Sequence, residues 1–312
     1  MQGHSSVSSD DWVKVSSNYW EFLLQSFCSA SSSTISLSNR AKAIQQQDQE
    51  HDREWQEDFP VLPPSLLLGL TPAKQTTVKG FVYLVNSLIK STGDPNNDIV
   101  EIGMGKGYIS RILASSFYNY KILGIDVNGE KLRSNLRIHR LINSDKHTDL
   151  TIEAPTNLPR QQISNNLMAV NALLDDRPSQ LNNVIMSNLP FFSLGKPVGT
   201  MVQICIVGMN LCGDLSYKVV ENMCSSVENV SYSIKAASLV PCCAHLLTTF
   251  PISKNLKRQF QDKPFTLSQR LVALDLCYYI QEHLPNVKPF LKEFCAKSAN
   301  GGNNVMVQAI LL

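Results

Sequence analysis

Apolar and polar residues follow one another in blocks that predict alternating strands and helices from residue 98 onward. Short, nearly continuous apolar runs are typical of buried strands, and they occur at 98–102, 120–126, 202–210, 232–240 and 304–312. Apolar residues that return every three or four positions predict amphipathic helices, and they do so at 78–89, 128–142, 215–227 and 267–283. This alternation predicts an α/β fold, a parallel sheet with helices on both faces.

Three further segments have weaker patterns. Residues 149–153 predict a third strand, and the region 167–174 predicts a helix. The segment 187–192 (Ser-Asn-Leu-Pro-Phe-Phe) predicts a loop, because only nine residues separate it from the strand that starts at Val202. A crossover between parallel strands needs a longer connection than that.

The first 58 residues predict a separate N-terminal extension. A polar, serine-rich start leads into an aromatic-rich segment at 12–27 that is predicted to be helical and to need a partner surface. Residues 41–58 are polar almost all round, which favours a solvated helix or a linker. The proline-rich segment 59–64 stops any helix. We therefore expect a helical, partly disordered extension at 1–58 and one domain at 59–312.

A glycine-rich turn follows the first predicted strand and is the first indication of a ligand site. Glycines stand at 103, 105 and 107, immediately before a short amphipathic helix. Such spacing lets the backbone approach a ligand closely, and a helix start presents free N–H groups. The pattern G-x-G-x-G differs from the G-x-G-x-x-G of dinucleotide sites. By itself it is also compatible with a strand–turn–helix that binds nothing.

Two carboxylates flank this turn and narrow the choice of ligand. Glu101 stands two residues before Gly103, and Asp126 ends the second predicted strand, where α/β folds bind a ribose diol. A pyrophosphate would meet a like charge at Glu101. S-adenosyl-L-methionine carries an ammonium and a sulfonium and no phosphate, so it is the predicted cofactor. We expect Glu101 to hold the amino end and Asp126 the ribose, while Lys106 either neutralises Glu101, reaches the methionine carboxylate or faces solvent.

Composition sets limits on partners and compartment. The 312 residues are 43% hydrophobic and carry a formal net charge of +2, so any nucleic-acid binding must use a local patch. Eight scattered cysteines, no signal peptide and no apolar run of about 18 residues favour a reduced intracellular setting, cytoplasmic or nuclear, and no membrane span. Oligomeric state is left open.

Three ordered motifs resemble the methyltransferase-like protein 25 family, with a more distant kinship to a tRNA 2′-O-methyltransferase family. They are the glycine turn at 102–110, Val-Gly-Met-Asn-Leu-Cys-Gly-Asp-Leu-Ser at 207–216, and Pro-Cys-Cys-Ala-His-Leu-Leu at 241–247. With Phe-Pro-Ile-Ser at 250–253 and the helix at 268–274, the resemblance covers most of residues 59–312. It implies a seven-strand, Rossmann-like class I methyltransferase sheet that uses S-adenosyl-L-methionine.

The chain departs from that family at several positions. Asn210 stands where a histidine is usual, Met104 where a serine is common, and residues 73–78 lack a His and a Glu. These departures keep the fold and open a second hypothesis, a catalytically inactive methyltransferase-like module that binds protein partners.

Polar groups after the fourth and fifth predicted strands are the catalytic candidates. We expect Asn210, Asp214 and His245 to face the methyl acceptor, although Asp214 also suits a helix cap. Gly213 allows a tight turn. Methyl transfer from a sulfonium is an in-line displacement that needs mainly alignment, with a base only if the acceptor must lose a proton.

Cysteines around these groups raise the question of zinc. Cys212 precedes Gly213, and Cys242 and Cys243 follow the next strand. Adjacent residues of an extended chain point in opposite directions, so both cysteines would rarely reach one metal. We therefore expect Cys212, Gly213, Cys242 and Cys243 to line the substrate site, and we expect no metal.

The acceptor is less well defined than the cofactor. The predicted helix at 128–142 has basic residues, Lys131, Arg133, Arg137, His139 and Arg140, which suit either a solvated face or an RNA or acidic-substrate patch. The Asn-Leu-Pro-Phe segment resembles an adenine-dimethylase motif, but its predicted loop position disfavours base N-methylation. RNA is mildly preferred over protein as acceptor.

Overall fold

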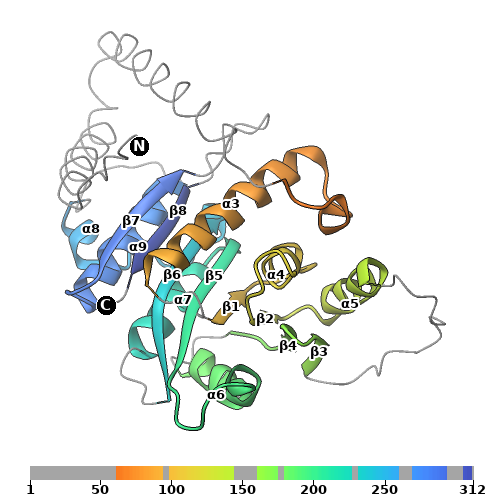
Figure 1. The fold of residues 1–312 in the computed structure, drawn as a ribbon. Coiled ribbons are helices and arrows are strands. Elements are labelled where there is room, and N and C mark those ends of the chain that lie inside the picture. The colour runs from red at the N-terminus through yellow and green to blue at the C-terminus, as the bar shows by residue number, and fades with distance from the viewer. Residues whose placement is uncertain are drawn as a thin grey trace, which may run out of the picture. The chain divides into compact units, whose positions relative to one another are not determined.

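The computed structural model of the protein describes residues 61–93, 98–143, 160–174, 179–226, 231–259, 269–293 and 305–310 (Figure 1). The predicted extension at 1–58 and the predicted strand at 149–153 lie outside these residues. Among the described helices, none combines the length and the apolar character needed to cross a bilayer.

The described strands form one sheet in the order β3-β4-β2-β1-β5-β6-β8-β7. Its strands are β1 (Asp98–Ile102), β2 (Ile122–Asp126), β3 (Arg160–Ser164), β4 (Leu167–Asn171), β5 (Val202–Cys212), β6 (Tyr232–Cys242), β7 (Lys288–Glu293) and β8 (Val305–Ile310). Neighbours from β4 to β6 are parallel, while β8 is antiparallel to both β6 and β7. The seven strands from β4 to β7 form the expected Rossmann-like class I methyltransferase sheet, and β3 is added antiparallel at one edge.

Helices cover both faces of the sheet, as the sequence predicts (Figure 1). One face carries α3 (Pro72–Ser91), α4 (Tyr108–Leu113) and α5 (Gly129–Asn143). The other carries α6 (Gln180–Ser193), α7 (Leu215–Ser226) and α9 (Gln269–His283), whose apolar residues share one core with alternate residues of β1, β2, β5 and β6. Short helices complete the described set: η1 (Pro64–Leu67), η2 (Ala244–Leu246) and α8 (Lys254–Gln259).

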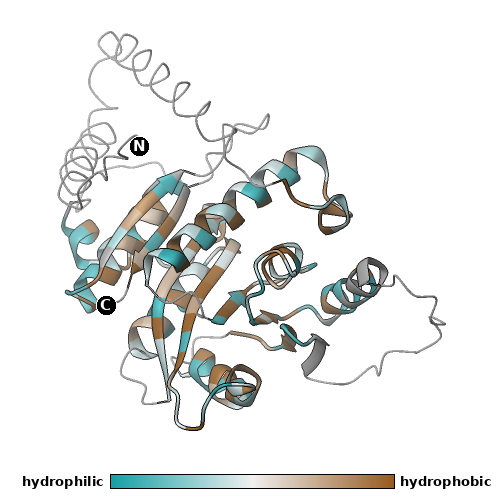
Figure 2. Ribbon diagram, in the orientation of Figure 1, coloured by the Kyte–Doolittle hydropathy of each residue, from teal (hydrophilic) through white to brown (hydrophobic). Residues whose placement is uncertain are grey.

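The apolar pattern explains these layers. Figure 2 shows apolar residues running through the strands, whereas α3 alternates apolar and polar residues along its length. In β1 all five residues are buried, as expected for a central strand with helices on both sides. The strands predicted at 98–102, 120–126, 202–210, 232–240 and 304–312 and the helices predicted at 78–89, 128–142, 215–227 and 267–283 are therefore confirmed. Their ends shift slightly, except that α3 begins well before residue 78, at Pro72.

The prediction of a helix around residues 167–174 is wrong. Leu167–Asn171 form β4, which pairs in parallel with β2 and buries Leu167 and Ala169. A short apolar run without period fits a buried strand and a buried helix equally well. In the structure this segment pairs with β2 on one side and with β3 on the other, so it is a strand.

The prediction of a loop at residues 187–192 is also wrong, because the segment lies in α6. Pro190 stands near the C-terminal end of this helix, and Asn188 donates its amide to the carbonyl of Val184 one turn earlier (2.7 Å). Phe191 and Phe192 are 7% and 0% exposed. The helix that connects β4 to β5 thus contains the Asn-Leu-Pro-Phe motif. Buried rings cannot stack on a nucleobase, so the adenine-dimethylase resemblance has no structural counterpart.

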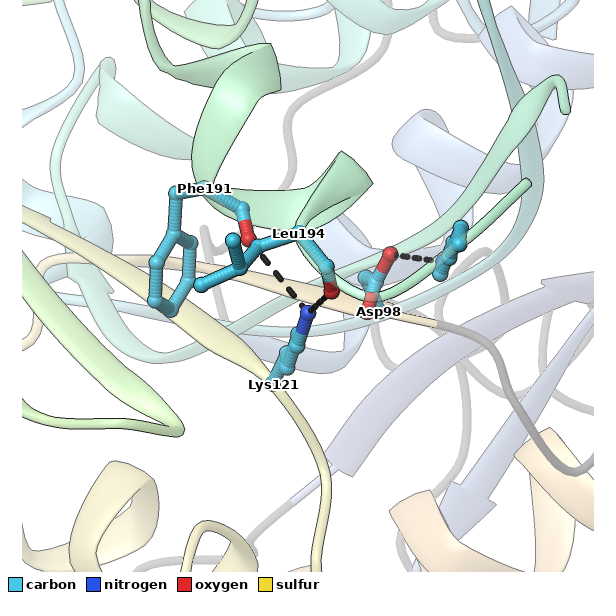
Figure 3. A network of polar contacts seen from close by, with 5 residues as sticks. Asp98, Lys121, Phe191 and Leu194 are labelled. Atoms are coloured by element: carbon cyan, nitrogen blue, oxygen red, sulfur yellow. Dashed lines mark hydrogen bonds and ion pairs between the residues drawn. The ribbon is translucent and has the colours of Figure 1, made fainter. Parts of the chain in front are cut away.

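Two lysines fix the connection from α6 to β5 against the starts of the central strands (Figure 3). Lys121, just before β2, donates from Nζ to the carbonyls of Phe191 (3.5 Å) and Leu194. Lys196 forms an ion pair with Asp98, the first residue of β1, at 2.6 Å. The Asp98 side chain is 4% exposed and that of Lys196 is 22% exposed, so the pair is largely shielded from solvent.

Removing one member of this ion pair should cost more than removing both. Lys196→Met removes the ammonium group that pairs with the buried Asp98 carboxylate, and we expect the free energy of unfolding to fall by about 2 kcal/mol. The double variant Asp98→Asn/Lys196→Met should lose less. Urea unfolding of the wild type, both single variants and the double variant measures the coupling, and purely additive losses would contradict it.

Candidate active site

The glycine turn joins β1 to α4 and lies over the end of β2. Gly103, Gly105 and Gly107 all have positive φ, at 69°, 56° and 66°. The N–H groups of Gly103 and Met104 both donate to the carbonyl of Ile125 (2.9 and 3.1 Å). Left-handed backbone at three alternate positions explains why glycine recurs at this spacing.

The three glycines have different surroundings. A Cβ at Gly103 would meet only Leu211 at 3.7 Å, and one at Gly105 would meet only the Gly103 carbonyl at 3.9 Å. A Cβ at Gly107 would lie 2.0 Å from the Asn135 side chain of α5. The first two glycines therefore leave room for a ligand to approach the backbone, and the third lets α5 pack against the turn.

Asp126 connects the glycine turn to the start of α5. One carboxylate oxygen accepts a hydrogen bond from the Gly105 N–H and the other from the Asn128 N–H, both at 2.7 Å. The residue is 8% exposed. A carboxylate has about four acceptor positions, so each oxygen retains one for a further donor such as a hydroxyl. The next residue, Val127, is 61% exposed and gives this position an apolar neighbour that the sequence analysis missed.

Glu101 lies beneath the turn and faces α4. It is 2% exposed, and Ser110 donates a hydrogen bond from its hydroxyl to the Glu101 carboxylate. Burial raises the pKa of Glu101 to about 8; hydrogen bonds from Ser110 oppose this shift and the charge of Asp126 adds to it. At neutral pH the carboxyl group is therefore mainly protonated, and an added positive charge nearby would favour its ionised form.

The raised pKa of Glu101 makes stability depend on pH. The folded state binds the proton more tightly than the unfolded state, so its contribution is complete below pH 4.5 and is lost as pH rises toward 8. Within that window we expect the free energy of unfolding to fall by about 1.4 kcal/mol per pH unit. Glu101→Gln should flatten this slope, as measured by urea unfolding at pH 5.5, 6.5 and 7.5. Glu130→Gln, at an exposed site on α5, controls for the loss of a carboxylate, and equal slopes in all three proteins would refute the assignment.

A bulge at Asn210 shapes the end of β5. Met209 pairs with Val240 and Leu211 with Pro241, so Asn210 is the extra residue, exposed and left-handed with φ 62°. Both Asn and His tolerate this conformation better than most residues. Asparagine at this position therefore suits the backbone that the bulge requires.

Asp214 follows the bulge and binds across to the segment after β6. Its two carboxylate oxygens accept hydrogen bonds from the N–H and the hydroxyl of Thr248 (2.9 and 2.6 Å). Burial raises its pKa, but the hydrogen bonds from Thr248 and Thr249 and the charge of Lys218 outweigh that effect, so the net shift is downward. The carboxylate thus joins the loops after β5 and β6 in place of the expected helix cap.

Three cysteine thiols meet between these loops. The Sγ atom of Cys212 lies 2.9 Å from that of Cys242 and 3.3 Å from that of Cys243, and the latter two are 3.4 Å apart. The expectation that adjacent cysteines point apart is wrong here. Cys243 is left-handed (φ 52°), so the extended chain ends before it and the alternation of side chains no longer applies.

The predicted residues fall into two groups along the carboxyl ends of the strands. Glu101, Gly103, Gly105, Gly107 and Asp126 gather at the ends of β1 and β2, whereas Asn210, Asp214 and the three cysteines gather at the ends of β5 and β6. Lys106 and His245 are exposed. In parallel sheets this edge is the usual place for ligands.

Comparison with known proteins agrees with the fold. A protein family described as a methyltransferase domain matches residues 73–250, more than half of the chain. The chain belongs to this methyltransferase family. Among curated proteins, no sequence matches it.

Solved structures with a similar fold are distant in sequence. Magnesium protoporphyrin IX methyltransferase from Synechocystis PCC 6803, with bound SAH, is 12% identical over 77% of this chain and 84% of its own, with a TM-score of 0.42. A putative O-methyltransferase from Klebsiella pneumoniae is 11% identical over 86% of this chain and 99% of its own (TM-score 0.43). At these values neither likeness bears on the substrate of this chain.

Proposed function

We propose that the protein transfers a methyl group from S-adenosyl-L-methionine, with RNA preferred over protein as the acceptor. The observation that carries the proposal is the position of Asp126, a carboxylate with spare acceptor capacity beside two glycines at which an added Cβ would make only ordinary van der Waals contact, in a chain of a methyltransferase family. The resemblance to the methyltransferase-like protein 25 family supports the same assignment.

The chain's own groups fit the parts of this cofactor. The free acceptor positions of Asp126 suit the two ribose hydroxyls, and exposed Val127 suits one face of the adenine ring. Gly103 and Gly105 allow the methionine part to lie against the backbone. An ammonium near Glu101 would lower the pKa of that carboxyl group and favour release of its proton. When bound, the cofactor supplies the activated methyl group.

Methyl transfer requires an acceptor aligned with the methyl group at near-contact distance. Asn210, at the bulge near the end of β5, and His245, after β6, are exposed and are the proposed groups that face the acceptor. Asp214 positions this edge through Thr248. The cysteine cluster and Gly213 are the proposed lining.

Basic residues of α5 support an anionic acceptor. Lys131 and Arg137 are exposed and Arg133 is half-buried. The charge of Lys131 reaches Cys212, where it lowers a thiol pKa that burial raises. The charge of Lys131 thus acts at the end of β5, and this supports attraction of an RNA phosphate there. We propose a reducing compartment, the cytoplasm or the nucleus, and the free thiols of the described cysteines support it.

Isothermal titration with S-adenosylmethionine tests the cofactor site. We expect saturable binding by the wild type. A tenfold or greater loss is expected in Asp126→Asn, which weakens charge-assisted hydrogen bonds, and in Gly105→Val, which fills the space over the turn. Gly199→Val is the matched control, because Gly199 has φ 84° and nothing within 4 Å of a Cβ. Normal binding by Asp126→Asn and Gly105→Val would refute the site.

Transfer of a tritiated methyl group to total RNA and to total protein tests the reaction. Label in RNA is expected for the wild type and should be absent in Asp126→Asn. Label in protein alone would contradict the RNA preference. Folded protein that labels neither and binds no cofactor would favour the inactive, partner-binding module.

A further inference from the structure

The cluster of Cys212, Cys242 and Cys243 is assembled by specific backbone features. The three Sγ atoms lie within 4.8 Å of one another, and Cys212 is exposed while the other two are half-buried. None of the six cysteines in the described residues forms a disulfide. The cluster therefore presents three thiols to one point at the carboxyl edge of the sheet.

The pairing register of β5 with β6 brings the thiols of Cys212 and Cys242 together. Cys212 and Cys242 are paired residues on the adjacent parallel strands β5 and β6, and the bulge at Asn210 produces that pairing. The N–H of Gly213 donates to the carbonyl of Cys242 (3.1 Å) and closes the pair. A Cβ on Gly213, which has φ 55°, would lie 3.0 Å from the Leu246 carbonyl, so the turn requires glycine.

The left-handed conformation of Cys243 brings in the third thiol. A disulfide uses two sulfurs, whereas a convergent set of three is the arrangement that a thiophilic cation requires. In a tetrahedral zinc site with Zn–S bonds of about 2.3 Å, sulfurs lie about 3.8 Å apart. The observed separations of 2.9 to 3.4 Å are within an ångström of that value, so modest side-chain rotation would open the set to receive an ion.

The electrostatic surroundings suit a bound cation with thiolate ligands. Three thiolates and one Zn²⁺ carry a net charge of −1, and Lys131 lies close enough to Cys212 for its positive charge to favour the thiolate. Burial raises the pKa of both Cys212 and Cys242. Zinc binding replaces the thiol protons, so each coordinated sulfur is a thiolate.

We propose that Cys212, Cys242 and Cys243 bind one Zn²⁺ ion, with its fourth coordination position open to solvent. Three protein ligands with one exchangeable position are typical of catalytic zinc sites, whereas structural sites are closed by four. Such an ion would stand at the ends of β5 and β6, whereas the glycine turn follows the neighbouring strand β1. The proposal does not depend on cofactor binding.

Zinc and cobalt binding by the full-length, reduced protein tests the site. We expect one Zn²⁺ per chain, and Co²⁺ in its place should show thiolate charge-transfer absorption. Each of Cys212→Ser, Cys242→Ser and Cys243→Ser should weaken zinc binding at least tenfold. Cys224→Ser, on α7, is the matched control and should bind as the wild type does. Imidazole should shift the cobalt spectrum, and an unchanged spectrum would contradict the open position.

Alkylation of the wild-type protein gives a readout that does not depend on the folding of any variant. Zinc should protect Cys212, Cys242 and Cys243 from iodoacetamide while the labelling of Cys224 stays unchanged. Folded, reduced wild type that binds no zinc, or zinc retained in the triple serine variant, would overturn the proposal. A disulfide that persists among these residues under reducing conditions would also overturn it. Titration of S-adenosylmethionine into the serine variants shows whether the cofactor site is intact, so that failure of the zinc site can be distinguished from failure of the cofactor site.

Discussion

The pair of hydrogen bonds made by Asp126 is the constraint on which the candidate site depends. One carboxylate holds the glycine turn through Gly105 and the start of α5 through Asn128. The end of β2, the turn after β1 and the first turn of the next helix are therefore fixed relative to one another. A ligand at this edge meets a surface that is already ordered, and it does not have to provide the free energy for ordering it.

Much of the fold was predictable from the sequence because its central strands are short apolar runs between amphipathic helices. That signal located β1, β2, β5, β6 and β8. It failed for β4, since an apolar run of that length has no helical or strand period. The signal also failed for β7. Half of the residues in its sequence, Lys-Pro-Phe-Leu-Lys-Glu, are charged. The strand lies at the sheet edge, where fewer side chains need to be buried and the apolar pattern is weaker.

The candidate site was predictable in outline but not in its contacts. Glycine spacing predicted a turn after β1, and the structure has that turn, with all three glycines in left-handed backbone. The sequence could not show that Glu101 turns under the loop toward Ser110, because only the packing of α4 decides this. The meeting of the cysteines was equally hidden, since it needs positive φ at Cys243 and a bulge at Asn210, and few residues other than glycine adopt such φ values.

The bulge at Asn210 also changes the pairing register between β5 and β6. The register with β6 shifts between Ile204 and Cys205 and shifts again at the bulge, so Leu211 and Cys212 pair with a different offset from the buried residues just before the bulge. Changes in the packed half of the strand therefore need not be transmitted to its tip. The tip chemistry of this sheet can diverge while the interior stays the same, which gives one architecture the freedom to serve different acceptors.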